Sequence, residues 1–195
     1  MIKEDHRSLI KTVFNTYNTL SEEALDFLDS SYLLKEYKAH DFILEAGRTE
    51  KHFYIVVSGV AMIYLINRNG ERVVLGFSFE GNFSGVYDSF LKQTPSVLFL
   101  ETLSPMKALA FSKETYFEFF EKFPEMMKWR ALFFEGILLG RLSREAELLT
   151  QSAEQRFLSF MERCPEPLLQ IPQKYLASYL NMTPETFSRM RSKKR

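Results

Sequence analysis

Apolar residues recur every three to four positions at the start of the chain, which is the spacing of one face of a helix. This stripe consists of Leu9, Ile10, Val13, Phe14 and Tyr17. Ser21 then has the properties of a helix N-cap, because two glutamates follow it in the first turn, where negative charge suits the helix dipole. We therefore expect the first 30 residues to be helical.

From residue 33 to residue 112 the pattern changes to short runs rich in β-branched and aromatic residues, which is typical of strands. The runs cover residues 54–57, 60–66, 72–79, 97–102 and 106–111. Asn69-Gly70 lies between two of these runs and predicts a two-residue hairpin turn, since both turn positions favour positive φ. Many short strands at even spacing indicate a closed roll or barrel.

After residue 112 the spacing of apolar residues becomes helical again. Residues 115–122 predict a short helix, and Pro124 suits the first turn of a longer helix that runs to about Thr150. Another helix is expected over residues 152–163. Pro165 and Pro167 then interrupt the chain.

The predicted long helix is apolar on more than one side. Leucine or alanine repeats every seven residues along it, at Leu132, Leu139 and Ala146 and again at Leu142 and Leu149. A single helix this apolar has two faces to bury, for example one against the roll and one against a partner helix. We interpret these five residues as the interface of a homodimer; a helix buried wholly inside one domain is the alternative.

Two glycines, Gly136 and Gly140, stand one turn apart on this helix. Each glycine in a helix interior costs about 1 kcal/mol relative to alanine. The pair therefore indicates a need for space, either for a partner helix or for a bulky ligand, unless both glycines are merely tolerated.

The last 25 residues have the pattern of two short helices joined by a tight turn. The first helix is expected to begin at Pro172 or Gln173 and to end at Tyr179, and Asn181 suits the turn because asparagine tolerates the left-handed conformation. Thr183 is the expected N-cap of the second helix, with a proline directly after it at the first helical position.

The second of these helices has an apolar side and a polar, basic side. Phe187 and Met190 are expected to pack on the first helix, which leaves Thr186, Ser188 and Arg189 free to project outward, together with Arg191. This pattern predicts a helix-turn-helix with a basic recognition helix. A helical hairpin with a solvated face is the alternative.

Charge is unevenly distributed, although the net charge of the chain is zero. Residues 171–195 contain six basic residues and one acid, so this segment carries +5 and the other 170 residues carry −5. An acidic body with a basic end is expected of a sensor joined to a nucleic-acid-binding segment.

Residues that commonly hold cofactors or perform catalysis are few. Cys164 is the only cysteine, which excludes an intrachain disulfide and any multi-cysteine metal or iron–sulfur site within one chain. The histidines His6, His40 and His52 match no metal motif, and the sequence has no glycine-rich phosphate loop and no nucleophile elbow. We expect no metal, haem or iron–sulfur cofactor and no catalytic residues; an enzyme on a cupin-like barrel is the weaker alternative.

Hydropathy and the first residues bear on localisation. The longest clear apolar run, residues 60–66, is far shorter than the roughly 20 residues that a membrane helix needs. The charged N-terminus, residues 1–5, does not have the pattern of a signal peptide. A cytoplasmic protein without a membrane partner is therefore expected.

The order of these elements resembles the Crp/Fnr family of bacterial transcription regulators over nearly the whole chain. The resemblance includes Gly81-Asn82-Phe83-x-Gly85 in the roll and Phe123-Pro124 at the start of the long helix. Its most specific part is Thr183-Pro-Glu-Thr-Phe-Ser-Arg189, which resembles the recognition-helix pattern Ser/Thr-x-Glu-Thr-x-x-Arg of that family. The implied fold is α+β: a jelly-roll sensor of the cyclic-nucleotide-binding type with flanking helices, a long dimerisation helix and a C-terminal helix-turn-helix.

The resemblance implies which residues contact DNA. Glu185 and Arg189 would read base edges, in agreement with the ability of arginine to bond guanine and of glutamate to accept from cytosine. The whole expected contact set is Lys174, Thr183, Glu185, Thr186, Ser188, Arg189, Arg191 and Lys193. The implied partners are double-stranded DNA with a palindromic site, RNA polymerase, a second copy of the chain and a small-molecule effector of unknown identity.

Two positions in the roll depart from the cyclic-AMP-binding members of the family. Those members place a glutamate for the ribose and an arginine for the cyclic phosphate where this chain has Val86 and Ser96-Val97. A buried phosphate charge without a partner is costly, so we expect weak cyclic AMP binding or none. By position alone, the expected effector pocket consists of Tyr64, Ser84, Gly85, Val86, Ser96, Val97 and Arg141.

The family usually adds a β-hairpin wing after the recognition helix, whereas this sequence ends at Lys193-Lys194-Arg195, which could supply some of the phosphate contacts of a wing. We therefore expect a sensor domain over 1–123, a dimerisation helix over 124–150 and a DNA-binding domain over 151–195. The predicted function is a ligand-responsive transcription regulator. A sensor that acts through protein contacts without DNA is the alternative.

Overall fold

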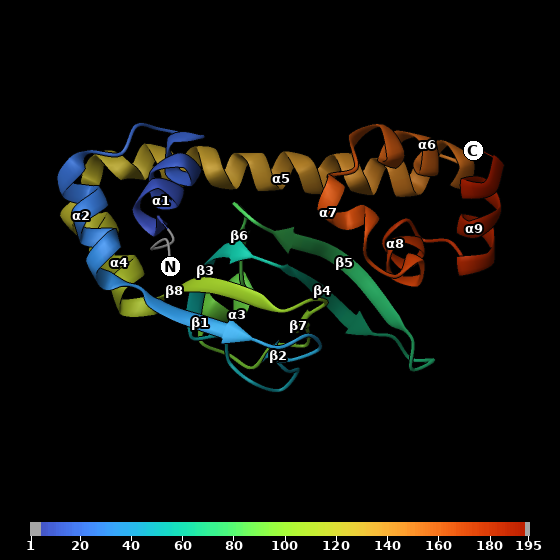
Figure 1. The fold of residues 1–195 in the computed structure, drawn as a ribbon, viewed down its shortest axis with the longest axis horizontal. Helices are drawn as coiled ribbons and strands as arrows, with labels where there is room; N and C mark the ends of the chain where they lie inside the picture. Colours follow the sequence, from blue (N-terminus) through green and yellow to red (C-terminus); the bar gives the residue numbers. More distant parts are fainter. Residues whose placement is uncertain (1–4, 194–195) are drawn as a thin grey trace.

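The computed structural model describes residues 5–193. A β-roll forms the centre of the molecule, and the long helix α5 runs along one side of it (Figure 1). Three helices, α1, α2 and α4, gather at one end of α5, and the C-terminal helices α6 to α9 gather at the other. Two of the sequence predictions extend beyond the described residues: the character of the N-terminus, at residues 1–4, and the phosphate contacts of Lys194 and Arg195.

The roll consists of two four-stranded antiparallel sheets. One sheet has the strand order β1-β8-β3-β6 and the other the order β2-β7-β4-β5. The strands are β1 Leu33–Tyr37, β2 Phe42–Leu44, β3 His52–Ser58, β4 Val60–Ile66, β5 Arg72–Phe79, β6 Phe83–Ser84, β7 Phe99–Thr102 and β8 Met106–Ser112. Gly59 joins β3 to β4 with φ +90°, and a Cβ there would overlap the carbonyl oxygen of Pro105, so only glycine fits.

The helices begin and end close to the predicted positions. They are α1 His6–Asn15, α2 Glu22–Ser31, α3 Tyr87–Lys92, α4 Lys113–Lys122, a 3-10 turn Pro124–Met126, α5 Met127–Thr150, α6 Ala153–Arg163, α7 Glu166–Leu169, α8 Gln173–Tyr179 and α9 Pro184–Lys193. Ser21, Ser112 and Ser152 are N-caps whose hydroxyls accept a backbone N–H of the first turn. The predicted α+β fold is confirmed.

Strands β1, β2 and β6 and two short helices escaped the sequence analysis. Helix α3 lies between β6 and β7 and has no apolar stripe long enough to reveal it. Helix α7 begins directly after Pro165, where we predicted only a break in the chain. Both helices are short enough that tertiary packing rather than intrinsic propensity decides their formation.

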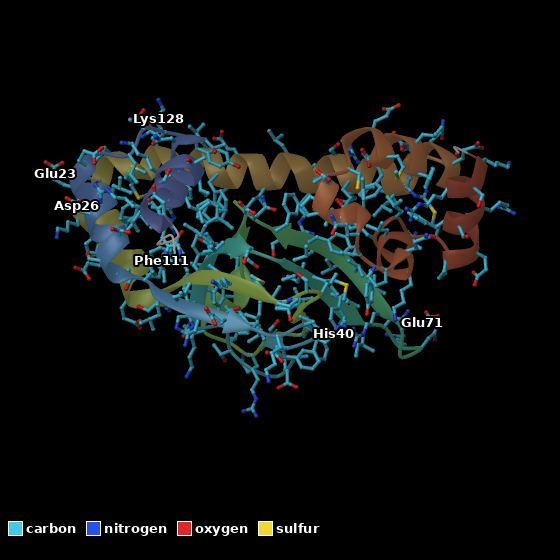
Figure 2. The ribbon with its side chains drawn as sticks, in the orientation of Figure 1. Glu23, Asp26, His40, Glu71, Phe111 and Lys128 are labelled. Atoms are coloured by element: carbon cyan, nitrogen blue, oxygen red, sulfur yellow. The ribbon has the colours of Figure 1, made fainter. Side chains whose placement is uncertain are left out.

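An aromatic core joins α1, α2 and α4 to the roll and to the first half of α5. Trp129, only 1% exposed, lies at its centre and donates a hydrogen bond to the carbonyl oxygen of Phe14 at 2.8 Å. Its ring stacks on Phe14 at 4.5 Å and on Phe133 at 5.0 Å between centroids. Most of the many phenylalanines thus serve packing. Figure 2 shows side chains filling the space between α4, α1 and α5.

A second core joins the C-terminal helices to the β4–β5 hairpin. Val60, Met62, Tyr64 and Val74 of the hairpin pack with Phe157, Leu176 and other buried residues of α6 to α9. Strand β5 is an edge strand, and helix α8 covers it: Ser178 Oγ accepts from the Val74 N–H at 3.0 Å and donates to the Arg72 carbonyl at 2.8 Å. The helix-turn-helix is therefore docked on the sensor.

Candidate effector pocket and nucleic-acid interface

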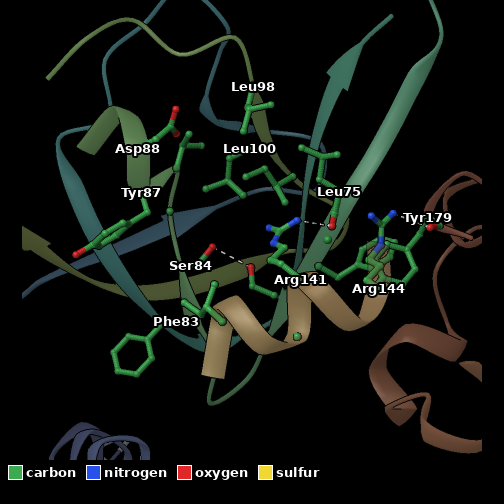
Figure 3. Close-up of a pocket in the computed structure, with 18 of the residues that line it drawn as sticks. Leu75, Phe83, Ser84, Tyr87, Asp88, Leu98, Leu100, Arg141, Arg144 and Tyr179 are labelled. Carbon is green, nitrogen blue, oxygen red and sulfur yellow. Dashed lines mark hydrogen bonds between the residues drawn. The ribbon is translucent and has the colours of Figure 1, made fainter. Parts of the chain in front are cut away.

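The main cavity of the sensor has a volume of about 560 Å³ and lies between the roll, helix α5 and Tyr179 of α8 (Figure 3). Its volume falls in the range of small-molecule sites. Most of the wall is apolar, with Ile63, Leu75 and Leu100 from the strands, Leu98 from the residue before β7 and Ile137 from α5. Gly136 and Gly140 both line the cavity, and the space that this glycine pair predicted is open at Gly140, whereas at Gly136 a Cβ would contact the Tyr17 ring at 3.6 Å.

Three charged residues line the cavity: Arg141 and Arg144 from α5, and Asp88 from α3. Arg141 extends into the cavity between Ser84 and Leu75, and its guanidinium donates to the Leu75 carbonyl at 3.3 Å (Figure 3). The hydroxyl oxygens of Ser84 and Ser78 form a hydrogen bond of 2.8 Å. The α5 side of the cavity is thus basic.

Arg144 connects the cavity to the helix-turn-helix. Its guanidinium donates to the carbonyl of Tyr179, the last residue of α8, at 2.8 Å and to that of Val74 at 3.4 Å, and it lies 4.5 Å from the centre of the Tyr179 ring. Its Nε is buried and has no hydrogen-bond partner within the part of the chain that the structure describes. Buried hydrogen-bond donors are nearly always paired, so the Arg144 side of the cavity has an unused hydrogen-bond donor.

The cavity brings together four of the seven expected pocket residues, Ser84, Gly85, Val86 and Arg141, and not the other three. Tyr64 points to the opposite side of its sheet and donates to the buried carboxylate of Glu101 at 2.9 Å, and burial together with this bond raises its pKa. Ser96 is turned into its own loop, where its Oγ accepts from the Leu98 N–H at 2.8 Å. Val97 is 76% exposed.

A buried glutamate that the sequence analysis did not single out lies behind the cavity. Glu50 is 2% exposed, and its carboxylate accepts the backbone N–H groups of Lys51 at 3.0 Å, His52 at 3.2 Å and Val86 at 3.4 Å. Its burial raises the pKa of the carboxyl group, while these three bonds oppose the rise. The Val86 N–H, at the start of α3, is therefore directed at Glu50.

The C-terminal helices α8 and α9 have the predicted helix-turn-helix geometry. Asn181 adopts φ +52° in the turn, and Thr183 Oγ1 accepts the N–H of Thr186 at 3.2 Å as the N-cap of α9. Phe187 is buried against the preceding helices, whereas Glu185 and Arg189 are exposed. The pKa of the Glu185 carboxyl is lowered by hydrogen bonds from its own backbone and from Thr183.

The remaining expected DNA contacts take different positions on α8 and α9. Ser188 and Lys193 share the exposed face of Arg189, while Arg191 is half-buried. Thr183 and Thr186 are engaged in the cap, and Lys174 is exposed on α8, with its amine 4.9 Å from the Tyr175 ring centre. Arg189 and Lys193 also line a groove toward Leu158 of α6.

Arg156 on α6, which the sequence analysis missed, fixes the turn of this motif. Its guanidinium is nearly buried and donates to the carbonyls of Leu180 at 2.9 Å and Asn181 at 3.1 Å. The positive charge therefore meets unpaired carbonyls at the C-terminal end of α8, where the helix dipole is negative. An arginine inside an amphipathic helix pattern gives no sign of this role in the sequence alone.

The second half of α5 has an uncovered apolar face. Leu138, Leu139, Leu142 and Leu149 are all more than half exposed, and with Ala146 they lie within one arc of the helix at 3.6 residues per turn. The cavity-lining residues Gly140, Arg141 and Arg144 lie on the other side of α5. Of the five expected dimer residues, Leu132 is half-buried and the other four are exposed.

The fold defines a sensor roll joined by a long helix to a helix-turn-helix. Residues 34–123 match the family model of the cyclic nucleotide-binding domain, which places that domain in the roll and α4. No curated protein matches the sequence significantly.

Solved structures with the same fold include three bacterial proteins. CLP, a c-di-GMP-responsive global regulator of Xanthomonas campestris, has 16% identity and a TM-score of 0.70, with 89% of this chain and 91% of that chain covered. DNR of Pseudomonas aeruginosa has 21% identity and a TM-score of 0.58, with 99% and 88% covered. The catabolite activator protein of Thermus thermophilus has 24% identity and a TM-score of 0.56, with 91% and 84% covered. The predicted resemblance is confirmed: residues 34–123 match the cyclic nucleotide-binding domain, and the chain has the fold of Crp/Fnr-type regulators.

Residues 5–193 contain neither a cluster of metal ligands nor a helix that could span a membrane. No three histidine, cysteine, aspartate or glutamate side chains are grouped in a way that could hold a metal ion. No helix within the same range has the length and apolarity to cross a membrane.

Proposed function

We propose that this protein is a ligand-responsive, DNA-binding transcription regulator of the Crp/Fnr type, that it works as a cytoplasmic homodimer without a metal, haem or iron–sulfur cofactor, and that it acts with RNA polymerase. The observation that carries the proposal is the exposed face of α9, where Glu185 and Arg189 stand one turn apart and Ser188 and Lys193 flank them. An ionised glutamate and an arginine offer cytosine and guanine their usual partners.

The dimer part of the proposal rests on the uncovered leucines of α5. Two copies of this face would bury each other, as in a coiled coil. Two recognition helices related by a two-fold axis would then read half-sites about 34–36 Å apart, one turn of DNA.

The proposal is tested by selection from random DNA at physiological salt, followed by affinity measurement with Arg189→Ala. We expect an enriched palindrome, and we expect Arg189→Ala to lower the affinity by about 1–3 kcal/mol, or roughly 5- to 150-fold, and to relax the preference at one base pair in each half-site. Arg48→Ala, an exposed arginine on the roll, is the charge-matched control and should leave affinity unchanged within about twofold. If no palindrome is enriched with the candidate ligands present, the proposal fails.

A sensor that acts through protein contacts is the second candidate, favoured by the extensive docking of the helix-turn-helix on β5. Deleting residues 171–195 would not separate the two functions, because Ile171 and Leu176 belong to the core that covers the β4–β5 hairpin. Point substitutions on the exposed face of α9 are the better test. Retained solubility with lost DNA binding identifies a DNA contact.

Cyclic AMP is expected to bind weakly or not at all. Val86 is fully buried and apolar, and the hydroxyl of Ser96 is committed to its own loop, so neither the ribose nor the cyclic phosphate would find a charged partner there. A missing buried charged partner costs about 2–5 kcal/mol, roughly 30- to several-thousand-fold in affinity. Calorimetry measures the dissociation constant of cyclic AMP, and a value in the low micromolar range would contradict the expectation. Ser96→Arg alone should not restore binding, since Val86 remains.

A further inference from the structure

We propose that the effector is an organic anion with an apolar body, held by its carboxylate or phosphate group on Arg141 and Arg144 of α5. This inference rests on the proposed function, because it names the ligand of the sensor cavity. It makes the α5 side of the cavity the anion-binding side, and the part of the cavity around α3 the place for the apolar body.

The lining of the cavity has a positive net charge. Its described lining contains two arginines and one aspartate, Asp88, a formal net charge of +1, and no lysine, histidine or glutamate. The two arginines stand three residues apart on α5, so their side chains emerge on neighbouring turns of one face. A guanidinium binds carboxylate and phosphate groups through parallel N–H donors.

Both arginines have hydrogen-bond donors that the described residues do not use. Arg141 makes one bond, at 3.3 Å to a neutral carbonyl, and its other donors face the cavity (Figure 3). One terminal nitrogen of Arg144 donates to both carbonyls, and its Nε is buried without a hydrogen-bond partner among the described residues. An anion between the two side chains would give Arg141 a charged acceptor in place of a weak neutral one, and would give the second terminal nitrogen of Arg144 an acceptor.

The part of the cavity around α3 has few free hydrogen-bond donors for an anion. The Val86 N–H, which could donate to a ligand there, is directed at the carboxylate of Glu50. The hydroxyl groups of Ser78 and Ser84 are hydrogen-bonded to each other, and Asp88 would repel negative charge. Leu98 and Leu100 instead provide an apolar wall, which suits hydrocarbon or ring carbon.

The same two arginines place the anion next to the docked helix-turn-helix. Arg144 holds the last carbonyl of α8 and lies over the Tyr179 ring, and Tyr179 itself lines the cavity. An anion that draws on Arg144 therefore competes with, or reinforces, a contact that holds the DNA-binding helices on the sensor. By linkage, the factor by which the anion changes DNA affinity equals the factor by which DNA changes anion affinity.

Calorimetry on the full-length protein with four probes of equal chain length tests the proposal: decanoate, decyl phosphate, decanol and decylamine, all below their micellar concentrations. We expect at least one of the two anions to bind at least about tenfold more tightly than decanol, and decylamine to bind no better than decanol. Arg141→Gln should weaken that anion by roughly 10- to 100-fold and leave decanol unchanged, whereas Arg141→Lys should retain part of the preference because the charge remains.

Equal binding of the anions and decanol, a preference for decylamine, the same anion affinity in Arg141→Gln, or no binding of either anion up to about 1 mM would each overturn the proposal. Arg189→Ala, on the exposed face of α9, serves as the control and should bind the anion as the unaltered chain does. Its DNA affinity reports separately on the proposed function. Anion binding without DNA binding would leave this inference standing and refute the regulator; DNA binding without anion binding would do the reverse.

Discussion

Trp129→Ala should destabilise the fold by about 4 kcal/mol, within the range of roughly 3–5 kcal/mol for removing a large buried aromatic side chain. The indole lies between Phe14 and Phe133 and donates its only N–H to the Phe14 carbonyl, so the substitution opens a cavity and removes this hydrogen bond, while the carbonyl keeps its bond from the Tyr17 N–H. Since a domain has only about 5–15 kcal/mol of net stability, most of it would be lost. The melting temperature should fall by roughly 10–15 °C.

Urea unfolding measured by circular dichroism would give the free energy of unfolding. Trp129→Phe separates the two contributions, because it keeps a ring in the stack and removes only the hydrogen bond and part of the volume. Lys128→Ala is the control; Lys128 is exposed on the outer side of α5 (Figure 2), and its replacement should change stability by less than about 0.5 kcal/mol. A loss below about 1 kcal/mol for Trp129→Ala would contradict the packing described here.

Leu142→Glu should convert the proposed homodimer to monomers. Leu142 is 52% exposed in the single chain and lies in the middle of the uncovered leucine face of α5. The two chains of the dimer are related by a two-fold axis, so each chain contributes one substituted residue. Two carboxylates without partners would therefore enter one apolar interface. An uncompensated buried charge costs about 3–5 kcal/mol, so the dimer dissociation constant should rise by at least roughly 150-fold.

Analytical ultracentrifugation of both proteins at micromolar concentration measures this effect, and DNA affinity should fall with it because a monomer reads only one half-site. Val97→Glu is the control: it places the same charge at an exposed apolar residue on a loop of the roll, away from α5, and the dimer should persist. If the unaltered chain is itself monomeric at that concentration, the dimer is refuted.

Local chemistry explains why so much of the architecture could be predicted. Helix caps such as Ser21 and Thr183, and the left-handed turn residue Asn181, act through hydrogen bonds and φ preferences within a few residues, so they are legible in one sequence. Strands β4 and β5 were predicted with the limits that the structure has, because the turn residues around them define where each run ends.

The ligand pocket was harder to predict because its residues come from segments far apart in the chain. Position along the roll led to Tyr64, Ser96 and Val97, yet the pleat turns Tyr64 to the other face of its sheet and the loop turns Ser96 into itself. Arg144, which lines the cavity, and Glu50, which accepts the N–H of the cavity residue Val86, carry no local pattern that marks them.

The sequence by itself determined the type and order of most of the longer elements, the helix-turn-helix with its basic face, and the two-sided apolar character of α5, because periodicity and capping are properties of neighbouring residues. Only the tertiary structure decided which face of α5 lines the cavity and which leucines stay uncovered. It also decided that Glu50 engages the start of α3, that Arg156 fixes the turn and that α8 docks on the edge of β5. These contacts depend on where the chain brings distant segments, and the free energy of each depends on burial that no local pattern encodes.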